Sequence, residues 1–442
     1  MIIQYTTANR RINKYPSPAI DLGREVPVIL VSVSSGETWT NSYYGAVRTT
    51  IVPPTITAIE NVEFGYPLAD VGTGANGFDP MYDPGNTMER KLFGLRIHTD
   101  AGITGEYVGG NSPAAAQIDT FAEYLLGKNP LKRERHWSEI DRGLRKYDRM
   151  GLGPVDIALW DFAGKYLDAS IHELLGSYRE RLPTYASTYP GDERGGLDSP
   201  AAFAAFAEEC AEMGYRGFKI HPWMGGDAVR DIDREVATVR ELGRRVGDGM
   251  DLMLDPACEY ETWVDALRVG RACDEAEFLW YEDPYRDGGY SQHGHRKLRG
   301  KLRTPLLQGE HVRGVEPKAD LVAADATDLL RADPEYDGGI TGVMKVARIA
   351  EGFGCDVELH APGPAQRQCM AAIRNTNYYE MAIVHPDLPN TVPPVYAGGY
   401  TDELDTIDDD GTVGVPDGPG LGVEYDWEYI LDHETGRREY EQ

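Results

Sequence analysis

The runs MDLMLDP (250–256), EFLWYEDP (277–284), TPLLQGE (304–310), DLLRAD (328–333) and DVELHAP (356–362) each end an apolar segment on an ionisable residue. These end residues are Asp255, Glu282, Glu310, Asp333 and His360, at spacings of 27, 28, 23 and 27 residues. A strand, a helix and two loops take up about this length. Polar residues at the C-terminal ends of successive buried strands are typical of the functional face of a β/α barrel.

The same repeat continues on both sides of this stretch. Further strands are predicted at LPTYAST (182–188), YRGFKIHP (215–222) and YYEMAIVHP (378–386). Helical spacing of apolar residues predicts intervening helices over 203–214, 232–248, 262–276 and 341–354. Eight strands with helices between them are what a closed barrel requires, so an α/β fold with a TIM-type barrel is expected.

The residues before the barrel predict a separate α+β domain. Strands are expected at 27–36 and in a hairpin over 91–110, and a helix over 112–127. A further helix is expected over 154–176, after this domain. Residues 37–90 show no clear periodicity and are interpreted as a long loop, which in a compact domain is usually functional or disordered. The predicted division is a capping domain (1–130), a catalytic barrel (131–386) and a segment returning to the cap (387–442).

Composition limits the possible partners and surroundings. The net charge of −28 disfavours binding to nucleic acid or to anionic lipid. With 33 Arg but only 11 Lys, the acidic balance favours adaptation to high salt over an ordinary acidic enzyme. No apolar run long enough for a membrane span and no signal peptide are recognised, so a cytoplasmic protein is expected. The five cysteines are interpreted as reduced packing residues.

Asp255, Glu282 and Glu310 are predicted to bind a hard divalent cation. Mg²⁺ prefers oxygen ligands and keeps open positions for water or substrate oxygens, and Mn²⁺ could substitute. No Cys/His cluster is apparent in the sequence, which argues against zinc. The alternative is that each acid only caps a helix N-terminus, but three acids in regular phase favour the metal site.

Other ionisable residues could move protons or hold a substrate. Asp333 could orient His360 as an acid or base, unless that histidine is purely structural. Lys219 and His221 lie two residues apart on one strand and therefore share a face. Lys219 could neutralise a substrate carboxylate, and His221 could act opposite His360 or merely end its strand. Glu380 could donate a hydrogen bond to a substrate carboxylate if it were protonated.

The chain resembles the enolase superfamily, and most of all its mandelate racemase branch. The motifs that carry the resemblance are FKIH, LDP, YED, QGEH, RADPEYDGGITGVMKVA, ELHAP and NYYE. The resemblance implies Mg²⁺ on Asp255, Glu282 and Glu310, His360 with Asp333 as one acid/base, and Glu380 near the substrate carboxylate. It also implies a capping domain and, as is usual in the family, a homo-oligomer. The racemase pattern Lys-x-Lys is Lys219-x-His221 here, which leaves the opposite base open.

The resemblance implies abstraction of the proton α to a carboxylate, giving an enediolate. Dehydration of an aldonic acid to a 2-keto-3-deoxy acid is the favoured outcome, with racemisation, epimerisation or cycloisomerisation through the same intermediate as the alternative. A non-catalytic metal-binding relative and a Schiff-base or hydrolytic barrel are weaker hypotheses. Substrate contacts are expected from the 37–60 segment and from residues just past strand ends: Asn41, Tyr43, Tyr44, Trp223, Arg286 and His311.

Overall fold

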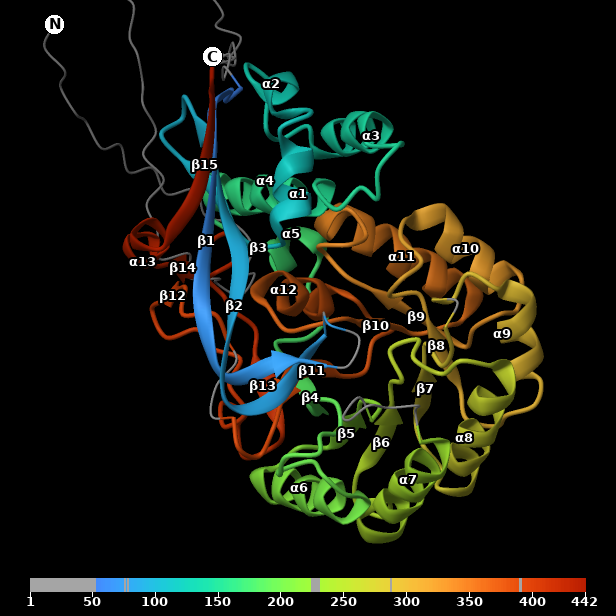
Figure 1. The fold of residues 1–442 in the computed structure, drawn as a ribbon. Coiled ribbons are helices and arrows are strands. Elements are labelled where there is room, and N and C mark those ends of the chain that lie inside the picture. Colours follow the sequence, from blue (N-terminus) through green and yellow to red (C-terminus); the bar gives the residue numbers. More distant parts are fainter. Residues whose placement is uncertain (1–52, 75–76, 78, 224–230, 287, 389–391) are drawn as a thin grey trace, which may run out of the picture. The chain divides into compact units, whose positions relative to one another are not determined.

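A barrel of parallel strands and surrounding helices forms the second part of the chain (Figure 1). The computed structural model describes residues 53–74, 77, 79–223, 231–286, 288–388 and 392–442. The barrel strands are β4 (Arg181–Thr188), β5 (Gly217–Ile220), β6 (Asp251–Leu254), β7 (Trp280–Glu282), β8 (Leu306–Gln308), β9 (Leu329–Ala332), β10 (Val357–Leu359) and β11 (Tyr379–Val384).

The sheet order is β10-β9-β8-β7-β6-β5-β4-β11, with every one of these neighbours parallel. The strands at the two ends of this order, β10 and β11, are in contact, so the sheet curls round on itself. The register aligns the strand ends, for example Lys219 with Met253 on β5 and β6. The barrel predicted from the repeat of apolar runs is therefore confirmed.

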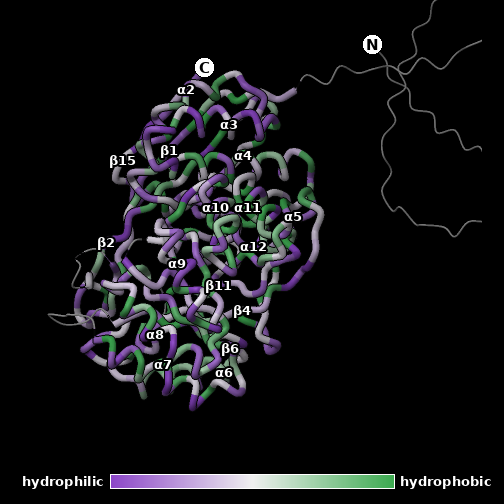
Figure 2. Tube along the Cα trace, turned by 90° about the vertical axis from the view of Figure 1, so that its right-hand side faces the viewer, coloured by the Kyte–Doolittle hydropathy of each residue, from purple (hydrophilic) through white to green (hydrophobic). Residues whose placement is uncertain are grey.

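Helices between the strands pack their apolar stripes against the barrel. They are α6 (Pro200–Met213), α7 (Ile232–Val246), α8 (Trp263–Glu275), α9 (Gln292–Arg299), α10 (Val315–Ala323), α11 (Gly339–Phe353) and α12 (Pro364–Ala372). Val239 and Leu242 of α7, three residues apart, are fully buried. Figure 2 shows hydrophobic and hydrophilic residues interleaved along these helices, as amphipathic segments require.

An antiparallel sheet with the strand order β15-β1-β2-β3 forms the cap. Its strands are β1 (Ile56–Thr73), β2 (Pro80–Thr99), β3 (Thr104–Gly109) and β15 (Glu434–Glu441). The accompanying helices are α1 (Ser112–Ile118), α2 (Ala122–Leu125), α3 (Arg133–Gly143), α4 (Leu152–Leu167) and α5 (Ile171–Leu175). The α+β cap expected from sequence is confirmed, including the hairpin that β2 and β3 form.

The predicted long loop over 37–90 is wrong for its described part. Residues 56–73 and 80–90 belong to β1 and β2, which pair along most of their length. Val62, Phe64, Tyr66 and Leu68 alternate as buried positions, a strand period that Gly65 and Pro67 obscured. The predicted strand at 27–36 and the first part of the loop lie outside the described residues.

Two predicted helices are each divided in the structure. The helix expected over 112–127 is α1 followed by α2. The helix expected over 154–176 ends at Asp168, whose left-handed backbone terminates α4. A new helix, α5, then begins with Ser170 and Glu173 in a capping box and ends at Gly176. Trp160 of α4 is half-buried and donates a hydrogen bond to Thr341.

The C-terminal segment returns to the cap. It contributes β12 (Tyr396–Ala397), β13 (Thr412–Gly414), β14 (Glu424–Tyr425) and α13 (Trp427–Asp432) before β15 pairs with β1. β13 adds an antiparallel pairing to the start of barrel strand β4. The domain boundaries at 130 and 386 stay predictions. Among the described residues, no helix combines the length and apolar character needed to cross a membrane.

The long β1–β2 hairpin reaches the C-terminal ends of two barrel strands. Tyr82, near its tip, stacks on His385 directly after β11, with ring centroids 4.2 Å apart. Asp83 pairs with Arg194 in the loop after β4. The cap thus covers part of the barrel face at which the ionisable strand-end residues gather.

Candidate active site

Three carboxylates from consecutive strand ends lie together at the C-terminal face of the barrel. Asp255 follows β6, Glu282 is the last residue of β7 and Glu310 follows β8. Their nearest oxygens all lie within 4.8 Å of one another. Parallel strands bring their carboxyl ends to one edge, so residues far apart in the sequence meet there. This group, called the carboxylate cluster below, has the donor set that Mg²⁺ prefers.

Two buried cations lie beneath the carboxylate cluster. Lys219 Nζ lies 3.0 Å from Asp255 Oδ2 and 3.2 Å from Glu282 Oε2. It also lies 2.9 Å from Oε1 of Glu380, a residue of β11. Arg331 pairs through Nε with Glu282 Oε1 at 2.7 Å and through a terminal nitrogen with Glu380 Oε2 at 3.0 Å.

The charges of these groups fit one divalent cation. Within the described site, Asp255, Glu282, Glu310 and Glu380 carry four negative charges when ionised, and Lys219 and Arg331 carry two positive charges. Two negative charges remain, leaving the imidazoles aside. Burying unbalanced carboxylates is costly, and a bound cation of charge two would remove the imbalance.

The electrostatics of the carboxylates show the same imbalance. Burial raises the pKa of the Glu282 carboxyl to about 7, because desolvation together with the Asp255 charge outweighs Arg331 and Lys219. Burial alone would also raise the pKa of Asp255, but Lys219 and His221 hold it well below its ordinary value. A divalent cation beside Glu282 would favour its ionised form.

Glu380 lies between the two buried cations of the site. Burial alone would raise its pKa, but Lys219 and Arg331 hold that pKa far below its ordinary value. Its Oε2 also accepts a hydrogen bond of 2.9 Å from the Ala361 N–H. Glu380 is a charge partner for Lys219 and Arg331, and its contact with a substrate carboxylate stays a prediction.

Asp333 and His360 form a close pair at the ends of β9 and β10. Their Oδ2 and Nδ1 atoms are 2.6 Å apart, and His360 Nε2 lies 3.4 Å from Glu310 Oε1. Burial by itself lowers the pKa of His360, but the Glu310 charge and the hydrogen bond to Asp333 raise it to about 10. The ring of Tyr336 stacks on the imidazole, with centroids 5.7 Å apart.

The cap helps to hold the loop that carries Asp333. Glu335 accepts hydrogen bonds of 2.6 Å from the Tyr107 hydroxyl and from the Gly110 N–H, both from the cap. Gly153 at the start of α4 allows close approach, because a Cβ there would lie 2.3 Å from the Glu335 carbonyl oxygen. Asp333 in turn accepts a hydrogen bond of 2.6 Å from the Glu335 N–H.

His221 lies on the other side of the carboxylate cluster from His360. Its Nδ1 lies 2.7 Å from the Thr188 carbonyl oxygen, an acceptor, so Nδ1 carries the proton. Its Nε2 lies 3.3 Å from Asp255 Oδ2. In both histidines Nδ1 is held by an oxygen of the protein, and Nε2 faces the carboxylate cluster.

The predicted substrate-binding residues are spread over several surroundings. Trp223 is buried, and its backbone N–H and indole N–H donate to Glu235 and Thr238 of α7. Arg286 is exposed and pairs with Glu261. His311 is partly exposed, with Nε2 3.9 Å from Glu310 Oε1. Asn41, Tyr43 and Tyr44 lie outside the described residues. Substrate binding by all of these stays a prediction.

Arg331 was missed in the sequence although it pairs with two carboxylates of the site. It is fully buried in β9, where one terminal nitrogen also donates to the Tyr185 hydroxyl at 3.0 Å. The signal was an arginine inside the apolar run DLLRAD, since an arginine in a buried strand needs charged partners. The sequence interpretation used only the residue that ends that run.

A barrel with a carboxylate cluster at its C-terminal face, covered by an α+β cap, is the architecture of the enolase superfamily. The models "Enolase C-terminal domain-like" and "Mandelate racemase / muconate lactonizing enzyme, N-terminal domain" match residues 202–429 and 83–176. The chain belongs to the mandelate racemase/muconate lactonizing enzyme family. It is an enzyme that uses Mg²⁺ in abstracting the proton α to a carboxylate, the reaction that this superfamily shares.

Named relatives and a solved structure agree with this assignment. A D-galactarolactone cycloisomerase of Agrobacterium fabrum is 29% identical over 345 residues, covering 75% of this chain and 88% of its own. A D-xylonate dehydratase of Haloferax volcanii is 27% identical over 380 residues, covering 77% and 84%. The magnesium complex of a D-glucarate dehydratase from Agrobacterium tumefaciens aligns with a TM-score of 0.75 at 27% identity, covering 86% and 99%.

Proposed function

We propose that this enzyme dehydrates an aldonic acid to a 2-keto-3-deoxy acid. The observation that carries the proposal is the pair of imidazoles on opposite sides of the carboxylate cluster. His221 Nε2 lies 3.3 Å from Asp255, and His360 Nε2 lies 3.4 Å from Glu310. Loss of water needs one group to take a proton and another to give one, and each imidazole offers a single fixed nitrogen for this.

Asp255, Glu282 and Glu310 would hold the Mg²⁺, and Mn²⁺ could substitute for it. When bound, Mg²⁺ supplies positive charge beside the substrate carboxylate and so stabilises the negative charge that develops as the α-proton leaves. Lys219, held by three carboxylates, adds a fixed positive charge on the same side.

The two histidines then have different tasks. His221 Nε2 takes the proton from C2 of the substrate. His360 Nε2 gives its proton to the hydroxyl on C3, and the C3–O bond breaks with release of water. The enol that remains tautomerises to the 2-keto-3-deoxy acid. The close contact between Asp333 Oδ2 and His360 Nδ1 favours the protonated imidazole, which suits His360 for the acid role.

The relatives support a sugar acid as the substrate class. Several relatives are named as dehydratases of D-xylonate, D-gluconate and D-galactonate, at 27–28% identity, and others as dehydratases of L-talarate/galactarate and L-rhamnonate, at 26% and 25%. These acids share a 2-hydroxy carboxylate with a hydroxyl on C3, which is the arrangement that the two imidazoles require. At this level of identity the length and stereochemistry of the sugar chain are for experiment to determine.

A panel of aldonic acids with Mg²⁺, at low and high salt, tests the proposal. The 2-keto-3-deoxy product is detected as its semicarbazone. Turnover of one or a few aldonic acids, abolished by EDTA and restored by Mg²⁺, is the expected result. A blank panel from folded protein that binds Mg²⁺ would contradict the dehydratase assignment.

Cycloisomerisation is the second candidate, because the relative with 29% identity is a D-galactarolactone cycloisomerase. Epimerisation would use the same two imidazoles without loss of water. Reaction in D₂O separates these outcomes. Deuterium at C2 with the C3 hydroxyl retained indicates epimerisation or proton exchange, whereas ring opening of a lactone without loss of water indicates a cycloisomerase.

The remaining hypotheses from sequence are disfavoured by the site. A Schiff base requires a neutral lysine, but Glu282 and Glu380 outweigh burial and raise the pKa of Lys219 well above its ordinary value. Borohydride with substrate should therefore trap no adduct. A non-catalytic relative would be expected to lack a ligand or an acid/base residue, and all of those predicted are present.

A further inference from the structure

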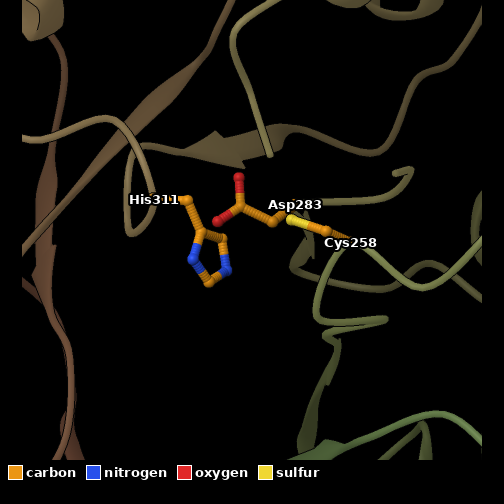
Figure 3. Close-up of side chains that lie close together, drawn as sticks. All are labelled: Cys258, Asp283 and His311. Atoms are coloured by element: carbon orange, nitrogen blue, oxygen red, sulfur yellow. The ribbon is translucent and has the colours of Figure 1, made fainter. Parts of the chain in front are cut away.

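A second group of potential ligands lies beside the carboxylate cluster. Cys258, Asp283 and His311 come from the loops after β6, β7 and β8. Their sulfur, oxygen and nitrogen atoms all lie within 4.8 Å of one another. In the view of Figure 3, the Asp283 carboxylate lies between the His311 ring and the Cys258 sulfur.

The Asp283 carboxylate lacks the partners that a buried acid needs. It is 1% exposed, and neither of its oxygens has a hydrogen-bond partner among the described residues. The Gly309 backbone N–H favours the charged form of this carboxyl, but burial and the charges of Glu282 and Glu310 have larger opposite effects and raise its pKa. Burying a carboxylate in this way is expensive unless a cation, or a proton, compensates for it.

The chemistry of the three groups selects the kind of cation. Thiolate, imidazole and carboxylate together are ligands of Zn²⁺ and related ions, whereas Mg²⁺ takes oxygen ligands. We propose that Cys258, Asp283 and His311 hold a second divalent cation of the zinc class, separate from the Mg²⁺ on the carboxylate cluster. Three protein ligands leave a fourth position for water.

The two metal sites share the same three loops. Asp283 follows Glu282, and His311 follows Glu310, so each of these loops carries one ligand for each site. The ligand atoms of the two sets nevertheless form two separate groups. The Cys258 N–H already donates to the Asp283 carbonyl at 2.8 Å. A cation here ties together the loops that position Glu282 and Glu310.

Cobalt provides a direct test, because a thiolate bound to Co²⁺ gives a charge-transfer absorption that carboxylates alone do not. Full-length protein is saturated with Mg²⁺ and titrated with Co²⁺ under reducing conditions. The expected result is one equivalent of Co²⁺ that produces this band. The band should disappear in Cys258→Ser and weaken strongly in Asp283→Asn. Cys355→Ser is the matched control, since Cys355 is also partly buried but lies outside the group.

Several outcomes would overturn the proposal. A titration without the thiolate band would mean that Asp283 is compensated by a proton and that the group holds no zinc-class ion. A band that persists in Cys258→Ser but disappears in Cys355→Ser would mean that Cys355, and not Cys258, binds the Co²⁺. Circular dichroism checks that each variant is folded. If Asp283→Asn does not fold, Cys258→Ser alone decides the outcome. Retention of one Mg²⁺ in Cys258→Ser keeps this test independent of the proposed dehydration.

Discussion

At the scale of single residues, the site depends on fixed charges as much as on its acid/base groups. Lys219 and Arg331 are buried against Glu282 and Glu380, and neither can reach solvent. Removing one partner from such a network leaves an uncompensated buried charge and is strongly destabilising. Substitutions that test chemistry are therefore best made at His221, His360 and Glu310, which lie at the edge of the network.

His221→Asn and His360→Asn should separate the two proton transfers. With His360→Asn, we expect loss of water to slow by roughly 10²- to 10⁴-fold, while exchange of the C2 proton with D₂O continues. With His221→Asn, we expect neither loss of water nor exchange of the C2 proton. The measurement is product formation beside deuterium incorporation by NMR, and His433→Asn, an exposed histidine, is the control. If His221→Asn keeps exchange and His360→Asn loses it, the roles are reversed.

Glu310→Gln should weaken Mg²⁺ binding without unfolding the protein. Glu310 is the most exposed member of the carboxylate cluster and does not pair with Lys219 or Arg331 in the described contacts. Removing the charge of a ligand oxygen should lower the affinity for Mg²⁺ by more than the roughly 10- to 100-fold that follows loss of a hydrogen-bond partner of a ligand. Calorimetric titration with Mg²⁺ measures this, with the exposed Glu261→Gln as the control. Unchanged affinity would remove Glu310 from the metal site.

At the scale of elements, the contact between α4 and the start of α11 contains a buried acid. Asp156 accepts hydrogen bonds of 2.8 Å from both the backbone N–H and the hydroxyl of Thr341. Burial outweighs these bonds and raises its pKa to about 7. The folded protein therefore holds a proton that the unfolded chain, with a pKa near 3.8, releases.

This proton sets the direction of a pH dependence. Asp156 contributes most to the free energy of unfolding below about pH 4. This contribution falls as the pH rises toward 7, by up to about 1.4 kcal/mol per pH unit. Asp156→Asn should remove that decline, so the variant gains stability relative to the original chain between pH 5 and 8. Urea unfolding across this range tests it. Asp168→Asn, at an exposed position just after α4, is the control. Its free energy of unfolding should change with pH in the same way as that of the original protein.

At the scale of the whole molecule, the net charge of −28 should make stability depend on salt. Repulsion among surface charges opposes the compact state, and salt shortens its range from about 10 Å at 0.1 M to about 3 Å at 1 M. We expect the Tm to rise with KCl over this range. Chloride is used because sulfate would strengthen apolar burial by itself. A Tm that stays constant or falls would contradict adaptation to high salt.

The sequence by itself determined the barrel and the face at which its ionisable residues gather. Apolar runs that end on Asp255, Glu282, Glu310, Asp333 and His360 at a nearly constant spacing predicted both the barrel and the common edge of its strands. This worked because strand burial and parallel pairing are encoded locally, in the period of the βα unit. The hairpin of β2 and β3 was predicted for the same reason, since its turn lies within a few residues.

Only the tertiary structure decided which polar groups become partners across the fold. It pairs Arg331 with Glu282 and Glu380, joins Glu335 to Tyr107 of the cap, and brings together Cys258, Asp283 and His311. It also shows that β1 and β2 are long paired strands where the sequence indicated a loop. The physical reason is that these contacts depend on geometry between distant segments, and no local period in the sequence records it.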